Sequence, residues 1–269
     1  MHPQSSSSQP YSIKHMNHKP YEWDYTNLAE HYIYRPPYAP KAIDWLFDIS
    51  RVKEADPCCD IGAGTGALTV ELLQRNLKVH AIEPNLAMRR IGEKNTQVFS
   101  EVQWMDGTGE KTGQANSQYA LVTYGSSFNT TTRSTALLES ARILRPNAWF
   151  ACLWNHRDRE DYIQKEVDSL IYRNIPKFTR GSRSEDQTNT ILASKAFSEV
   201  EFREERILHT IPTAEWLKAW RSHATLVKQA GSKLEKILTE IDVMVKSLTG
   251  DLIQVPYTTR IWAARVLKQ

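Results

Sequence analysis

A short apolar segment followed at once by three closely spaced glycines constrains this chain more than any other feature. The stretch from Cys58 to Gly66 reads Cys-Cys-Asp-Ile-Gly-Ala-Gly-Thr-Gly, and Ala67 to Asn76 then carries leucines at helical spacing. Glycine adopts backbone angles that are closed to other residues, and it lets a ligand lie directly against the main chain. The pattern predicts a strand, a glycine turn and a helix, as in the first unit of a nucleotide-binding sheet.

The glycine turn alone leaves two ligands open, NAD and S-adenosylmethionine. Gly62, Gly64 and Ala67 satisfy the dinucleotide fingerprint, in which alanine is accepted at the last position. Glu83 ends the next apolar segment, and an acid at this point binds the ribose hydroxyls of either ligand. The turn and this acid therefore do not discriminate between the two.

Three further features favour S-adenosylmethionine. The turn lies about fifty residues into the chain, Asp60 precedes the first glycine by two, and an Asp106-Gly107-Thr108 turn ends a third strand-like segment. With these features the chain resembles the class I S-adenosylmethionine-dependent methyltransferases.

The resemblance extends from Tyr32 to Trp154. Counterparts of family segments follow in the family's order at Ile82 to Asn85, Tyr119 to Phe128, Ala141 to Asn147 and Trp149 to Trp154. The leader Tyr34-Arg-Pro-Pro-Tyr38 is similar to a Tyr-Arg-Pro-Gly-Tyr segment of the small-molecule branch, which includes trans-aconitate and ubiquinone-type methyltransferases. A His-Trp pair common in the family after the fourth strand is Asn129-Thr130 here, so the acceptor of a relative does not carry over.

Strands and helices alternate from Pro57 to Trp154, which predicts a parallel sheet covered on both faces. The resemblance implies an α/β fold: a Rossmann-like seven-stranded methyltransferase sheet whose last strand is antiparallel, with a helical cap. Thr179 to Thr190 is polar and is expected to be a loop. The predicted segments are a disordered tail (1–20), leader helices and the S-adenosylmethionine-binding core (21–154), a cap insertion (155–198), a core strand (199–212), cap helices (213–257) and the final core strand (258–269).

The resemblance also implies how the cofactor, S-adenosylmethionine, is held. The glycine turn would carry its methionine part, Glu83 the ribose, Pro84 and Met88 a face of the adenine, and Asp106 the adenine amine. Asp60 is expected to orient the turn or the amino group of the cofactor. The full set of expected cofactor-binding residues is Asp60, Gly62, Gly64, Gly66, Glu83, Pro84, Met88, Asp106, Gly107, Ser126 and Arg35.

Methyl transfer from a sulfonium is an in-line displacement, so the acceptor must be aligned and, for some acceptors, deprotonated. Histidine has a pKa suited to proton removal near neutrality, which makes His156 and His223 candidate bases. The alternative is that both are structural, and an amine acceptor delivered neutral needs no base. The residues expected on the acceptor side are Tyr32, Tyr34, Asn129, Trp154, Trp216 and Trp220.

The expected function is methyl transfer to the oxygen, nitrogen or carbon of a small, apolar or aromatic-bearing metabolite in natural-product biosynthesis. One alternative is a cofactor-binding module or cyclase that transfers no methyl group, and another is an NAD-dependent oxidoreductase. No Asp or Glu lies between Ala115 and Leu138, at the tip of the predicted fourth strand. A cluster of oxygen ligands for a hard cation is therefore not expected there, and the predicted reaction needs no metal.

Charge and composition limit the partners. The 34 basic and 31 acidic residues give a net charge of +3, which is too balanced for a nucleic-acid partner. No apolar run approaches the ~20 residues of a membrane span. Three cysteines in apolar segments fit a reducing compartment. We therefore expect a cytoplasmic monomer or homodimer that acts on a small molecule, without nucleic acid or membrane.

Overall fold

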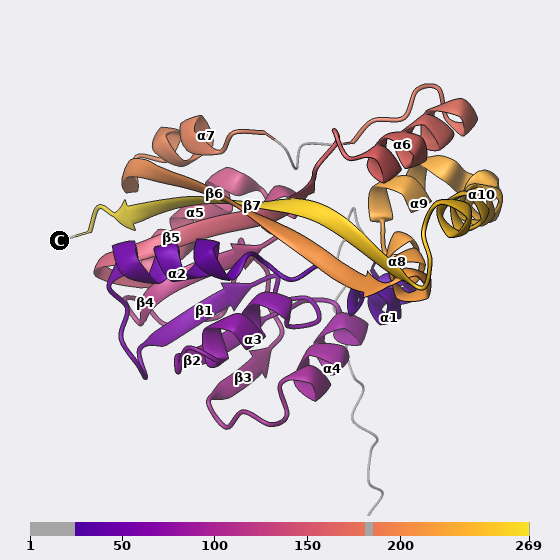
Figure 1. Cartoon of the computed structure of the whole chain (residues 1–269). Helices are drawn as coiled ribbons and strands as arrows, with labels where there is room; N and C mark the ends of the chain where they lie inside the picture. The colour runs from indigo at the N-terminus through magenta and orange to yellow at the C-terminus, as the bar shows by residue number, and fades with distance from the viewer. Residues whose placement is uncertain (1–24, 181–184, 269) are drawn as a thin grey trace, which may run out of the picture.

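A seven-stranded sheet runs through the protein in the order β3-β2-β1-β4-β5-β7-β6, as the computed structural model of residues 25–180 and 185–268 shows (Figure 1). Strand β7 is antiparallel to β5 and β6, and the pairs from β3 to β5 are parallel. This confirms the predicted fold with its antiparallel last strand. The strands are β1 (Pro57–Ile61), β2 (Lys78–Ile82), β3 (Val102–Met105), β4 (Tyr119–Gly125), β5 (Leu144–Arg157), β6 (Phe197–Pro212) and β7 (Leu252–Val266).

Helices cover both faces of the sheet, and a separate group gathers at one end of it (Figure 1). The helices of the leader and the sheet are η1 (Thr26–Leu28), α1 (Ala29–Tyr32), α2 (Pro40–Ser50), α3 (Ala67–Leu73), α4 (Leu86–Asn95), η2 (Phe128–Thr130), α5 (Arg133–Ile143) and α7 (Thr188–Ala193). The helices of the group at the end, called the cap here, are α6 (Tyr162–Asn174), α8 (Thr213–Trp220), α9 (Ala224–Ala230), η4 (Gly231–Lys233) and α10 (Leu234–Leu248). Helix α7 begins inside the segment that was expected to be a loop. The predicted tail, residues 1–20, lies outside the described residues.

The two faces of the sheet have different apolar clusters, and the adjacent residues Cys58 and Cys59 belong to one cluster each. Cys58 belongs to the cluster under α2 and α3, whereas Cys59 belongs to the cluster that contains residues of α5. Adjacent strand residues point to opposite faces, so a central strand that is buried on both faces needs two consecutive apolar side chains. Both thiols are free and buried, as is that of Cys152.

The cap has an apolar cluster of its own, built on the long ends of β6 and β7. Val167 of α6, Trp216 of α8 and Ile237 of α10 pack there with Val255 and Tyr257, which belong to β7. Strand β7 begins at Leu252, earlier than the predicted residue 258, because it continues past the sheet as a ribbon with β6. That ribbon carries the cap over the carboxyl end of the sheet (Figure 1).

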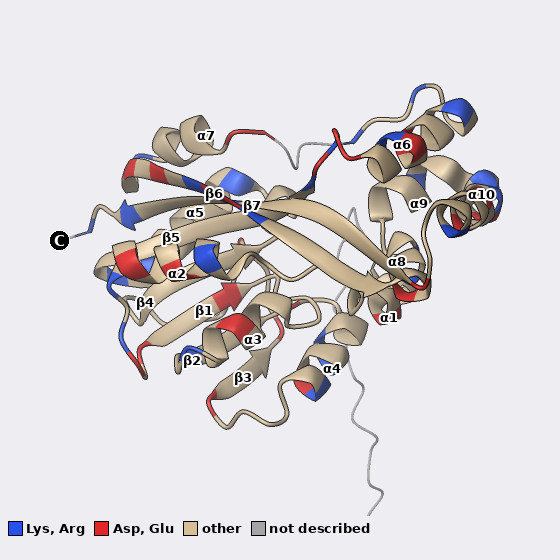
Figure 2. Ribbon diagram, viewed as in Figure 1, with Lys and Arg blue, Asp and Glu red and all other residues tan. Residues whose placement is uncertain are grey.

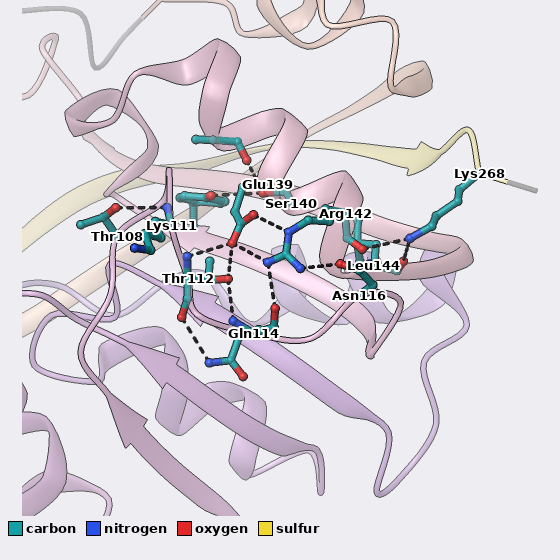
Figure 3. A network of polar contacts seen from close by, with 12 residues as sticks. Thr108, Lys111, Thr112, Gln114, Asn116, Glu139, Ser140, Arg142, Leu144 and Lys268 are labelled. Carbon is teal, nitrogen blue, oxygen red and sulfur yellow. Dashed lines mark hydrogen bonds and ion pairs between the residues drawn. The ribbon is translucent and has the colours of Figure 1, made fainter.

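The loop that follows β3 is anchored on α5 by a buried polar network (Figure 3). Glu139 accepts hydrogen bonds from the amide of Thr112 at 2.9 Å and from its hydroxyl at 2.5 Å, and Arg142 donates to the same carboxylate at 2.7 Å. Burial opposes ionisation of Glu139, but the bonds from Arg142 and Thr112 outweigh it and lower the pKa to about 2. The network therefore fixes the loop that begins at Asp106.

Candidate functional site

The glycine turn joins β1 to α3 at the carboxyl end of the sheet. Gly62, Gly64 and Gly66 have φ values of +65°, +60° and +86°, a region that favours glycine. The amides of Gly62 and Ala63 both donate to the carbonyl of Ile82, at 2.8 and 3.0 Å. The turn is therefore fixed to the end of β2, next to Glu83.

Gly62 and Gly64 are needed for different reasons. A Cβ atom at Gly62 would lie 2.4 Å from Cβ of Ser127, so the residue permits close approach of the β1 turn to the segment after β4. A Cβ atom at Gly64 would meet nothing closer than the Met88 Cε at 3.4 Å, an ordinary contact. The main chain at Gly64 is thus open on the side that a ligand could approach.

Glu83 is the acid at the end of β2, and its side chain is 7% exposed. The amide of Gly64 donates to its Oε2 and the amide of Asn85 to its Oε1, both at 2.8 Å. Burial raises the pKa of Glu83, and the two amide bonds act against that rise. Each carboxylate oxygen has a second lone pair. The side chain can therefore hold the turn and still accept hydrogen bonds from ligand hydroxyls.

Asp60 is fully buried in β1 and binds two threonine hydroxyls. Thr69 of α3 donates to Oδ2 at 2.7 Å, and Thr123 of β4 donates to Oδ1 at 2.9 Å. Burial raises the pKa of Asp60 to about 6, although both threonine bonds lower it. Asp60 therefore ties the first strand to the following helix and to the neighbouring strand.

We expect Asp60→Asn to flatten the pH dependence of stability between pH 4 and 6. The unfolded aspartate titrates near 3.9, so between that pH and about 6 the folded state binds more protons, and stability falls as pH rises. The rise of about two pKa units corresponds to about 3 kcal/mol of stability that the unaltered protein loses over this pH range. Asparagine does not titrate, so the variant should not show this loss. Urea unfolding of the ligand-free protein from pH 4 to 7 measures the slope. Asp106→Asn, at an exposed position, is the control, and an unchanged slope in Asp60→Asn would contradict the prediction.

One cavity of about 1120 Å³ joins the glycine turn to the leader and the cap. It continues from the core past the ends of β4 and β5 to helices α6, α8 and α9. Most of the residues that the sequence singled out line it. They are Tyr32, Arg35, Asp60, Gly62, Gly64, Glu83, Pro84, Met88, Ser126, Asn129, His156, Trp216, Trp220 and His223.

Five predicted residues are not among those that line the cavity: Gly66, Asp106, Gly107, Tyr34 and Trp154. Gly66 opens α3, and a Cβ atom there would meet the ring of Trp104 at 3.3 Å. The exposed Asp106 pairs with Arg89 at 3.3 Å, and a Cβ atom at Gly107 would overlap Ile82. Direct contact of Gly66, Asp106 and Gly107 with the cofactor stays a prediction.

Two predicted acceptor-side residues, Trp154 and Tyr34, do not line the cavity. Trp154 is buried in β5, and its indole N–H donates to Oδ1 of Asn129 at 2.9 Å. Trp154 thus orients an amide that does line the cavity. The ring of Tyr34 faces the ammonium group of Lys218, 5.1 Å from the ring centroid, and so contacts α8 of the cap.

The leader is bound to the cap across the cavity. Arg35 donates from Nε to the hydroxyl of Ser222 at 2.7 Å and from Nη2 to its carbonyl at 2.6 Å, just after α8. Its guanidinium lies 4.6 Å from the ring centroid of Tyr32. Asn155 at the end of β5 donates to the carbonyls of Pro36 and Pro37. Leader, sheet and cap therefore close round the same space.

The two candidate bases have different surroundings. His223 receives a hydrogen bond at Nε2 from the guanidinium of Arg157, because arginine has only donors. The lone pair of that nitrogen is thus occupied, and His223 could act as a base only after this contact breaks. His156 is half-buried, lines the cavity and precedes Arg157 in β5. Both catalytic roles stay predictions.

Comparisons with known proteins assign the core. Residues 59–152 match the family described as a methyltransferase domain, and these residues contain the glycine turn, Glu83 and strands β2 to β4. Residues 59–152 of the chain form a methyltransferase domain. The resemblance inferred from the sequence is thereby confirmed.

The relatives of this methyltransferase domain agree with that assignment. An uncharacterized methyltransferase of Mycobacterium tuberculosis strain H37Rv is 31% identical over 139 residues, 52% of this chain and 54% of the relative. The chain thus spans about half the length of that relative. An uncharacterized methyltransferase-like protein of Schizosaccharomyces pombe is 22% identical over 89% of this chain and 93% of its own.

A solved structure supports the fold of most of the chain. A protein from Anaeromyxobacter dehalogenans, assigned as a type II methyltransferase, has a TM-score of 0.65 and 19% identity over 87% of this chain and 99% of its own. At this identity the similarity establishes the fold alone.

The methyltransferase domain has a site that suits its cofactor, S-adenosylmethionine. The open main chain at Gly64 and the free lone pairs of buried Glu83 match the methionine part and the ribose diol of that molecule. Within residues 25–180 and 185–268, no group of three or more His, Cys, Asp or Glu residues could hold a metal ion. Over the same residues, no helix has the length and apolar character needed to cross a membrane.

Several residues that line the cavity were not expected from the sequence. Arg157, Asp168, Arg180 and Lys228 come from β5, α6, the segment after α6, and α9. The position of Arg157 in the sequence could have identified it, because it follows the candidate base His156 at the end of a predicted strand. The other three lie in cap segments whose position over the sheet cannot be inferred from periodicity.

Proposed function

We propose that the protein transfers a methyl group from S-adenosylmethionine to a small molecule bound between the sheet and the cap. The observation that supports this most is the continuous cavity that reaches from Gly64 and Glu83 to the aromatic residues of α8. Its volume of about 1120 Å³ leaves room for an acceptor beside the cofactor. Because the relatives of about 30% identity are matched over only about half of their length, the activity of the whole protein is part of this proposal.

The protein would contribute alignment and exclusion of water. When bound, the cofactor supplies a methyl group on a positively charged sulfur. The Gly62 to Gly64 backbone and Glu83 would fix its position, and the cap residues would fix the acceptor in line with the methyl group. The leader, joined to the cap through Arg35 and Ser222, would keep water from the reacting atoms. His156 is the candidate to remove a proton where the acceptor requires it.

The acceptor is proposed to carry an apolar or aromatic body. Trp216, Trp220 and Tyr32 line the cavity together with Ile171 and Phe178, and this wall suits a bulky flat or hydrophobic group. Such acceptors are the basis for proposing a role in natural-product biosynthesis. An oxygen, nitrogen or carbon atom could receive the methyl group in this space.

The cellular setting is proposed from composition and burial. All three cysteines are free and buried, which fits a reducing compartment such as the cytoplasm. We propose a monomer or homodimer that needs neither a nucleic acid nor a membrane for its reaction.

Calorimetry and a substrate screen test the proposed function. The purified protein should bind S-adenosylmethionine and S-adenosylhomocysteine, and it should release the latter when mixed with amines, phenols, carboxylates or activated carbons. Binding of NAD without binding of either sulfur compound would replace the proposal with an oxidoreductase. Tight cofactor binding without turnover across the whole screen would favour a binding module or cyclase.

Replacing Glu83 by Ala should weaken S-adenosylmethionine binding about ten- to hundredfold, because hydrogen bonds to a charged group contribute ~1.5–3 kcal/mol. The exposed Glu93 of α4 provides the matched control, and Glu93→Ala should bind normally. The variant also loses the acceptor for two backbone amides, so its melting temperature must be recorded with its affinity. A folded Glu83→Ala protein with unchanged affinity would rule out the ribose role.

A further inference from the structure

Positive side chains gather in the half of the cavity that faces the cap. Four cations of the sheet and cap line it there, together with Arg35 of the leader and against one acid, Asp168: the four are Arg157, Arg159, Arg180 and Lys228. Elsewhere on the ribbon Lys and Arg are interspersed with Asp and Glu (Figure 2). The net charge of the chain is only +3, so this cluster does not reflect a generally basic surface. It is a local property of the cavity.

Arg157 has the most unusual surroundings of the four cations. Its guanidinium lies 3.8 Å from the ring centroid of Trp220 and donates to His223. Among the described parts of the chain, no carboxylate lies within ion-pair distance of it. The nearby acid Asp168 is already paired with Arg180. Burial lowers the pKa of Arg157 and the nearby Arg35 adds to this, whereas the Tyr257 hydroxyl and the charge of Asp168 oppose it, so the charge of Arg157 is only partly compensated.

A half-buried guanidinium whose charge is only partly compensated is costly, and an anion that binds it lowers that cost. Stacking on an indole covers the flat face of the guanidinium but leaves the N–H groups at its edge free to bind in the plane. Arginine has five such donors, and the contacts with His223 and with the Tyr257 side chain use part of the fork. The remaining donors match the two oxygens of a carboxylate or phosphate.

The sheet register places Arg157 on the acceptor side and away from the cofactor turn. Gly125, the last residue of β4, pairs with Leu153 of β5. Arg157 lies four residues further along β5, which at ~3.3 Å per residue is ~13 Å beyond the tip of β4. Strand β4 itself separates β5 from the β1 turn. An anion at Arg157 would therefore belong to a ligand of the cap half.

We propose that the methyl acceptor carries an oxyanion, a carboxylate or a phosphate, that binds Arg157. This inference rests on the proposed function and deepens it: the acceptor has an apolar or aromatic body against Trp216 and Trp220 and an anionic group against the arginine. The anion fixes the orientation of the acceptor, because it is attracted to the arginine side of the cavity while the apolar body packs against the tryptophans.

Matched ligands test the anion. Protein saturated with S-adenosylhomocysteine is titrated calorimetrically with benzoate, phenyl phosphate and benzamide, which share a ring and differ in charge. Benzoate or phenyl phosphate should bind about tenfold or more tightly than benzamide, and whichever is tighter identifies the oxyanion. Arg157→Gln should remove this preference and leave the affinity for S-adenosylhomocysteine within about threefold. Arg173→Gln, an exposed arginine on α6 outside the cavity, should keep the preference.

The outcomes separate the inference from the proposed function. Failure to bind either sulfur compound would remove the proposed function. With that binding intact, equal affinity for benzoate and benzamide, or no binding of either aryl anion at millimolar concentration, would overturn only the anion site. A loss of S-adenosylhomocysteine affinity in Arg157→Gln equal to the loss of anion affinity would also overturn it, because the arginine would then serve the cofactor. If Arg157→Gln does not fold, Arg157→Lys keeps the charge without the planar fork and should retain a reduced preference.

Discussion

Gly62→Ala should destabilise the folded protein by about 2–5 kcal/mol and abolish binding of S-adenosylmethionine. The residue has φ = +65°, where a side chain costs ~1–2 kcal/mol, and its new Cβ would lie 2.4 Å from Cβ of Ser127. Overpacking of this kind adds ~1–3 kcal/mol because backbone has to move. Urea unfolding measures the stability, and calorimetry measures cofactor affinity.

Gly64→Ala is the matched comparison, because it has a similar φ of +60° but no close neighbour at the new Cβ. It should cost only about 1–2 kcal/mol of stability while its methyl group occupies the side of the turn that the cofactor would approach. Gly64→Ala should therefore lose cofactor affinity out of proportion to stability. Equal stability losses in the two variants would show that the contact with Ser127 is relaxed at little cost.

These two glycines also show what the sequence could predict. Positive φ and close approach of a ligand are local requirements, so the motif predicted the turn between β1 and α3 and the position of Glu83 beside it. The burial of Cys58 and Cys59 on opposite faces follows from strand periodicity in the same way. Local rules of this kind predicted the core sheet and its order of elements.

Asp60 and Asp106 show where such prediction ends. The motif identified both as cofactor residues, but the hydroxyls of Thr69 and Thr123 that bind Asp60 lie on a helix and on a different strand. Arg89, which pairs with Asp106, comes from α4. Partners brought together by folding leave no pattern in a single sequence, and they decide whether a carboxylate faces the ligand or the core.

The cap was predicted as helices that place Trp216 and Trp220 on the acceptor side, but the contacts that hold it there were not predicted. The ribbon of β6 and β7 places α6, α8 and α9 over the sheet, and only this placement brings Arg157 against Trp220 and His223. The resemblance to a family could not supply these contacts, because its matches ended at Trp154. The residues most informative about the acceptor therefore come from the part of the chain that the family resemblance did not cover.

Trp216→Ala should lower the stability of the cap by about 3–5 kcal/mol and sharply reduce turnover, since truncating a buried tryptophan costs that much. Trp216 is 2% exposed and packs edge-on against Trp220, with ring centroids 5.7 Å apart, in the apolar cluster of the cap. That cluster is separate from the two that cover the sheet. S-adenosylmethionine affinity should consequently stay within roughly 1 kcal/mol of the unaltered protein, as expected for distant sites.

Hydrogen exchange and calorimetry on Trp216→Ala, with Trp216→Phe as the conservative control, separate a wall of the acceptor site from simple packing. Faster exchange should be confined to α6, α8, α9 and α10, because the sheet has its own core. Trp216→Phe keeps an aromatic ring and should recover most of the stability and turnover.

His223→Ala should likewise reduce turnover and spare cofactor binding, since His223 lines the cavity beside Arg157. If both alanine variants lose cofactor binding and turnover to the same extent, these residues hold the whole structure together and the aromatic acceptor site would have to be abandoned.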